Sequence, residues 1–109
     1  MNRNYKLFLE DIREAIKQIQ ELKVSEEEFN KNLIVQGSVL RKLEIIGEAS
    51  KNLPRMLKEK NNHIDWARME RLRDNLIHSY FEISLSSVWK YIIKELPRIK
   101  EGLNNLKLV

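Results

Sequence analysis

The sequence contains no cysteine, only two prolines and three glycines, and no apolar run as long as a membrane span. The absence of cysteine excludes a disulfide framework, a zinc–thiolate site and a cysteine nucleophile. Strands and tight turns need more glycine and proline than this, so the composition favours long helices. The N-terminal segment becomes charged too early for a signal peptide, and we expect a cytoplasmic protein that does not enter a membrane.

Charge of one sign does not dominate the chain. Its 109 residues include 20 Lys and Arg and 16 Asp and Glu, which gives a formal net charge of +4. This weak positive bias permits RNA or another polyanion as a partner but does not demand one. We expect a single domain over residues 1–109, with no cofactor or bound metal ion, and a second subunit would help to cover its modest core.

Apolar residues recur at helical spacing in four segments, which predicts an all-α up-down bundle of four to five helices. The expected inner positions include Leu33 near the start of the second segment and Ile93 within the fourth. The predicted long helices span about residues 4–23, 33–53, 66–78 and 85–107.

Capping signals support these boundaries. Ser25 and Glu28 form an S-x-x-E capping box for a short helix that carries Phe29 inward. Asp65 and Ser84 are good N-caps for the third and fourth long helices. A further short helical turn is expected after Pro54. Gly47, inside the second long helix, indicates either a close helix–helix contact or simply a tolerated glycine, and both interpretations stay open.

The segment MERLRDNLIHSYFEI, residues 69–83, places four chemically versatile side chains within eight residues: Arg73, Asp74, His78 and Tyr80. Cleaving RNA without a metal ion needs a base for the 2′-hydroxyl, an acid for the leaving oxygen and fixed positive charge on the phosphate. Imidazole supplies the first two near neutral pH, and a guanidinium supplies the third. Asp74 stands four residues before His78 and could hold the imidazole in one tautomer.

One histidine and one arginine make only half of such a device, and a second copy across a two-fold axis would complete it. The plainer alternatives are a helix-end histidine on the surface, an arginine in weak surface ion pairs and a half-buried tyrosine. We assign no function to His63, the other histidine.

The string R-D-N-L-I-H-S-Y, residues 73–80, fits an R-x4-H-x-Y pattern and resembles the HepT-like toxins of the HEPN superfamily. LEIIGEASKNLP (43–54), IDWARMERLRDNLIHSYFEI (64–83) and VWKYIIKELPRI (88–99) are similar to family segments in the same order. The resemblance implies a HEPN fold and a homodimer with a shared cleft. It also implies a metal-independent ribonuclease toxin of a type VII toxin–antitoxin system, with Arg73 and His78 as the catalytic pair and Asp74 in support.

The same resemblance implies that a minimal nucleotidyltransferase antitoxin of the MntA type transfers AMP to Tyr80. The added negative charge and bulk would repel RNA phosphate and block the cleft. For Glu48, in the segment similar to the family's IGEA helix, we favour a polar contact between helices. The alternative function is a non-catalytic HEPN module for dimerisation and docking of a nucleotidyltransferase.

Overall fold

The computed structural model describes residues 4–78 and 83–109 and contains six α-helices within them. Four are long and two have six residues each, which confirms the predicted all-helical bundle. Their bounds are α1 Tyr5–Glu21, α2 Glu26–Lys31, α3 Leu33–Lys51, α4 Arg55–Lys60, α5 Trp66–His78 and α6 Leu85–Asn104.

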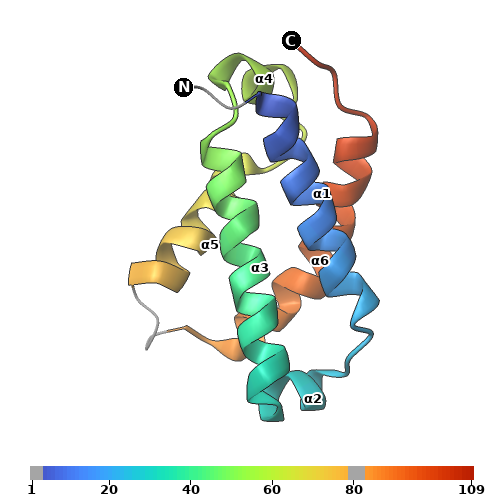
Figure 1. The fold of residues 1–109 in the computed structure, drawn as a ribbon, viewed down its shortest axis with the longest axis vertical. Helices are drawn as coiled ribbons and strands as arrows, with labels where there is room; N and C mark the ends of the chain where they lie inside the picture. Colours follow the sequence, from blue (N-terminus) through green and yellow to red (C-terminus); the bar gives the residue numbers. More distant parts are fainter. Residues whose placement is uncertain (1–3, 79–82) are drawn as a thin grey trace.

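The long helices alternate in direction, as an up-down bundle requires. Figure 1 shows α1 descending from the N-terminus, α3 returning, α5 descending again and α6 rising to the C-terminus. The short helices connect them at opposite ends, with α4 near both termini and α2 at the far end. Helix α3 is central, since it packs against both α1 and α5.

The predicted caps set the helix boundaries. The Ser25 hydroxyl accepts a hydrogen bond from the Glu28 amide at 3.1 Å, and Asp65 accepts one from the Arg68 amide at 3.1 Å. Ser84 caps α6 in the same way, at 3.2 Å from the Ser87 amide. Each bond satisfies an amide that has no partner inside its own helix, so short-range chemistry is sufficient to start these helices.

One apolar core runs between the helices and contains Phe29 from α2, as predicted. The prediction that Leu33 and Ile93 lie in the core is wrong, because Leu33 is 76% exposed and Ile93 is 54% exposed. Leu33 occupies the first position of α3, and Ile93 lies one residue, about 100°, beyond the buried Ile92 on α6. The fully or almost fully buried apolar side chains include Leu9, Ile12, Ile16, Leu43, Ile46, Leu57, Met69 and Leu96.

Within residues 4–78 and 83–109, no helix is both long enough and apolar enough to span a membrane. The longest helix, α6, continues through Pro97. A proline has no amide hydrogen, so it cannot bond the carbonyl four residues earlier in the helix.

Candidate functional site

Helix α5 carries three of the four predicted site residues: Arg73, Asp74 and His78. Its start is held by the Asp65 cap and by the Trp66 indole, whose Nε1 donates to the Asn61 carbonyl at 3.1 Å. His78 is the last residue of the helix. The motif therefore spans the end of α5, and Tyr80, predicted as the modification site, lies outside the described residues.

The guanidinium of Arg73 is held between two carboxylates. Its Nη2 lies 2.8 Å from Oε2 of Glu48 on α3, and its Nη1 donates to Oδ1 of Asp74 at 2.9 Å. The Asp74 hydrogen bond is the main cause that raises the pKa of Arg73, and the charge of Glu48 adds to it. The expected inter-helix polar contact of Glu48 is therefore made, and its partner is the predicted catalytic arginine.

Close packing of α3 against α5 allows this contact. Gly47, next to Glu48, faces the Arg73 side chain and the Met69 backbone, where a Cβ atom would have no room. The structure therefore decides between the two interpretations of Gly47 in favour of a close helix contact. Arg73 Nε is buried here without a hydrogen-bond partner among residues 4–78 and 83–109, which is a desolvation cost of the tight approach.

Asp74 does not make the contact expected for it. Its Oδ1 lies 2.6 Å from Nζ of Lys51 on α3 and accepts the Arg73 hydrogen bond; it makes no hydrogen bond or ion pair with His78. Lys51 first, and Arg73 second, lower the pKa of Asp74. The two cations attract the carboxylate, so it faces α3 instead of the helix end.

His78 is exposed and, among the described residues, makes no hydrogen bond or ion pair. Both ring nitrogens are thus free to exchange a proton with a ligand. Arg73 and His78 are five residues apart, roughly 140° around the axis of α5. A single helix therefore separates the two groups by a large angle, and their catalytic roles stay predictions.

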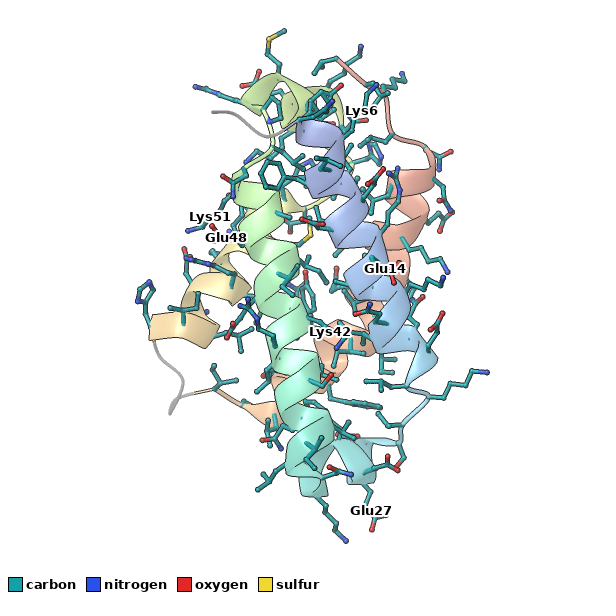
Figure 2. The ribbon with its side chains drawn as sticks, in the orientation of Figure 1. Lys6, Glu14, Glu27, Lys42, Glu48 and Lys51 are labelled. Atoms are coloured by element: carbon teal, nitrogen blue, oxygen red, sulfur yellow. The ribbon has the colours of Figure 1, made fainter. Side chains whose placement is uncertain are left out.

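Sequence reasoning did not identify Lys51 as part of this cluster. Figure 2 shows Glu48 and Lys51 on the side of α3 that faces α5. A second polar link lies nearby, where Glu70 of α5 accepts from the Ser50 hydroxyl at 2.7 Å and from the Lys58 ammonium at 3.2 Å. The signal available in the sequence was the spacing of Glu48 and Lys51, one helical turn apart, beside a glycine.

In the part of the chain that the structure describes, no three His, Asp or Glu side chains cluster so as to hold a metal ion. The other histidine, His63, has its Nε2 3.1 Å from the carbonyl of Gly102 on α6. His63 thus joins a connecting segment to the bundle. The chemistry available at the end of α5 is that of a guanidinium, an imidazole and the charged groups of α3.

The fold and these side chains define a small all-helical domain with an R-x4-H motif at the end of one helix. A protein-family comparison matches residues 12–106 to the family described as "Ribonuclease HepT-like". The chain therefore belongs to the HepT-like ribonuclease family, a group of HEPN helical bundles.

Individual relatives agree with this assignment. The chain is 41% identical to "Probable ribonuclease HepT" of Thermococcus cleftensis over 98% of its length and 99% of that protein. It is 41% identical to a candidate RNase of Methanocaldococcus jannaschii over 91% of its length and 84% of that protein. A longer protein of the same archaeon, a gamma-glutamylcyclotransferase and candidate RNase, is 40% identical over 94% of this chain but only 47% of its own length. No solved structure matches the chain significantly.

Proposed function

We propose that this protein is a metal-independent endoribonuclease in which His78 and Arg73 act on a phosphodiester of cellular RNA. The observation that carries the proposal is the exposed His78 at the end of α5, with neither ring nitrogen engaged by a described residue. Its imidazole accepts the proton of the attacking 2′-hydroxyl or donates one to the departing 5′-oxygen. Attack forms a bond between the 2′-oxygen and phosphorus and breaks the bond to the 5′-oxygen.

Arg73 supplies the positive charge that this reaction needs. Negative charge develops on the non-bridging oxygens of the phosphate, and a fork of N–H donors stabilises it. Glu48 and Asp74 hold the guanidinium at 2.8 and 2.9 Å. These carboxylates orient Arg73 but also compete with phosphate for it, so RNA must take over part of their hydrogen bonding.

A homodimer completes the site in this proposal. One α5 presents Arg73 and His78 roughly 140° apart, so a single chain does not surround a phosphate. A two-fold axis near the ends of two α5 helices brings a second arginine and histidine to the same cleft. Ile77, beside His78, is an exposed apolar side chain that a second subunit would cover.

The regulatory part of the proposal rests on the family resemblance of the motif. A minimal nucleotidyltransferase antitoxin of the MntA type transfers AMP from ATP to the hydroxyl of Tyr80 and releases pyrophosphate. The product places a phosphodiester two residues beyond His78, where it repels the RNA backbone. The protein is then the toxin of a type VII toxin–antitoxin pair in the cytoplasm.

Cleavage of a single-stranded RNA in the presence of EDTA tests the catalytic proposal. We expect the wild type to cut the RNA and His78→Ala to lose this activity. The control variant, His63→Ala, carries the same change at the other histidine and should still cleave when it is assayed well below its own unfolding temperature. Equal cleavage by wild type and His78→Ala would contradict the role of His78. For the regulatory step, mass spectrometry after incubation with the transferase and ATP should find AMP on Tyr80 and none on Tyr80→Phe.

A non-catalytic docking module for a nucleotidyltransferase is the second candidate function. The observation that favours it is the pairing of Arg73 with two carboxylates, which leaves little free positive charge. Under this alternative, both the wild type and His78→Ala bind the transferase and neither cuts RNA. The cleavage assay therefore separates the two functions.

A further inference from the structure

A cleft of about 520 Å³ lies between α5 and α6, away from the Arg73 ion pairs. Among the described residues, its polar lining comes from Arg68, Arg71 and Asn75 of α5 and from Ser84, Ser87 and Tyr91 at and beyond the start of α6. None of the described lining residues is acidic, although the chain has 16 acidic residues. The charged lining of the cleft is thus made of arginines, of which Arg68 is paired with Glu95 just outside the lining.

The residues of α5 that line the cleft share one stripe of the helix surface with His78. Arg68, Arg71, Asn75 and His78 are spaced by three, four and three residues, which places them within an arc of roughly 80° on the helix surface. Their backbone positions span about 15 Å along the axis. A strand lying on this stripe would therefore meet both arginines on its way to the imidazole.

Tyr91 lines the inner wall of the same cleft and is only 5% exposed. Its hydroxyl forms no hydrogen bond with any described residue and is not itself a fully buried atom, so a ligand in the cleft can reach it. The Arg68 guanidinium lies 5.4 Å from the centre of the Tyr91 ring and is 3.0 Å from Glu95, so it is held in place at the cleft. Burial raises the pKa of Tyr91, and the phenol remains a hydrogen-bond donor.

Two further features favour an anion. Arg71 is exposed and makes no ion pair or hydrogen bond with the described residues, so its guanidinium is available to a ligand. Helix α6 has 20 residues and begins at the cleft, where its N-terminal amides carry partial positive charge. The free guanidinium of Arg71, the Tyr91 phenol and the helix amides together are suited to phosphate oxygens.

We propose that the α5–α6 cleft binds the phosphate backbone of the RNA strand that flanks the bond to be cleaved. Arg71, Asn75 and the Tyr91 hydroxyl contact phosphate or ribose oxygens, and the strand continues along α5 to His78. This assignment rests on the proposed ribonuclease function and names a substrate subsite for it. The continuity of the stripe with His78 favours a strand over an isolated nucleotide.

Binding of a fluorescent single-stranded RNA oligonucleotide to the intact His78→Ala protein, followed by anisotropy over a series of salt concentrations, tests the subsite. Adding Arg71→Gln to this protein should weaken RNA binding several-fold. It should also reduce by about 1 the magnitude of the slope of the logarithm of the association constant against the logarithm of the salt concentration. The matched control is Arg55→Gln on α4, which removes the same charge from a side chain outside the cleft. Tyr91→Phe should also weaken binding, with the fold intact by circular dichroism.

Equal affinity and equal salt slope for Arg71→Gln and Arg55→Gln would overturn the subsite. Loss of binding to the nucleotidyltransferase, with RNA binding unchanged, would overturn it as well and identify the cleft as a protein-docking surface. Cleavage by the wild type is measured separately with Arg71 intact. If the wild type does not cleave RNA, the proposed function is wrong. If the Arg71→Gln variant cleaves RNA with the same KM as the wild type, only the proposed subsite is wrong.

Discussion

Gly47 on α3 lies directly against the side chain of Arg73 on α5. A Cβ atom at position 47 would meet the Arg73 Cβ and would lie only 2.6 Å from the Met69 carbonyl oxygen. The missing side chain lets the two helices approach, and the adjacent Glu48 then reaches the Arg73 guanidinium at 2.8 Å. A structural glycine and a charged contact of the candidate site are therefore consequences of one packing arrangement.

Replacing Gly47 with alanine should destabilise the fold. The new methyl group meets backbone as well as side chain, so α3 and α5 must separate, at a cost of about 1–3 kcal/mol. Gly37→Ala is the matched control, because nothing lies within 4 Å of a Cβ there and the same helix carries it. Urea unfolding should show Gly37→Ala unchanged or more stable by up to about 1 kcal/mol; a Gly47→Ala protein as stable as this control would contradict the close contact.

Glu48 should act as a positioning residue for Arg73. Glu48→Ala removes the acceptor that orients the guanidinium, and we expect kcat for RNA cleavage to fall roughly ten- to a hundredfold. Glu48→Gln keeps an oxygen acceptor and should restore most of kcat, with a lower KM because one competing negative charge is gone. Both variants should lose no more than about 1 kcal/mol of stability, since half of the Glu48 side chain is exposed. The idea fails if alanine and glutamine lower kcat equally.

Asp74 should make the stability of the fold depend on acid pH. Lys51 and Arg73 hold the pKa of Asp74 below its ordinary value. Its ion pairs therefore contribute fully above about pH 4, the ordinary aspartate value, and are lost as the pH falls through the lowered native pKa. The difference in unfolding free energy between wild type and Asp74→Asn should be constant at neutral pH and shrink towards zero in acid. Glu21→Gln, on an exposed pair 3.9 Å from Lys17, should show little difference at any pH.

Asn61 should contribute strongly to the stability of the fold, although it lies outside the candidate site. Its side chain is fully buried, donates to the carbonyls of Leu57 at 2.8 Å and Lys107 at 2.7 Å, and accepts from the Lys107 amide at 2.8 Å. Asn61→Ala removes all three of these hydrogen bonds, two of which hold the segment at Lys107 to the end of α4, and should cost about 2–3 kcal/mol in thermal or urea unfolding. Asn52→Ala, which loses one exposed bond to the Glu48 carbonyl, should cost less than about 1 kcal/mol. Similar losses in the two variants would refute the burial argument.

The helices and most of their ends were predictable because the information is local. Caps at Ser25, Asp65 and Ser84 act within four residues, and a period of about 3.6 identifies the buried side of each helix. The errors at Leu33 and Ile93 occur where that period is insufficient. Whether a side chain at such a position is buried depends on where the neighbouring helices end. The spacing of apolar residues along one helix carries no information about those ends.

The candidate site divides in the same way. Arg73 and His78 follow from the motif, because guanidinium and imidazole groups suit phosphodiester chemistry wherever they stand. The partner of Asp74 did not follow, because spacing along α5 indicated His78 while Lys51, 23 positions away in sequence, lies 2.6 Å from it in space. Asn61, which follows the short helical turn expected after Pro54, gave no signal of its hydrogen bonds to distant residues.

The amino-acid sequence alone determined the all-helical class, the helix starts and the chemical character of the motif, since these depend on residue types and on contacts within a turn or two of helix. The tertiary structure decided which charges meet Arg73 and Asp74, that a side chain at position 47 would have no room, and that a cleft lined by Arg68 and Arg71 lies between α5 and α6. Such relations are set by how closely whole helices pack, and that distance results from all core side chains together.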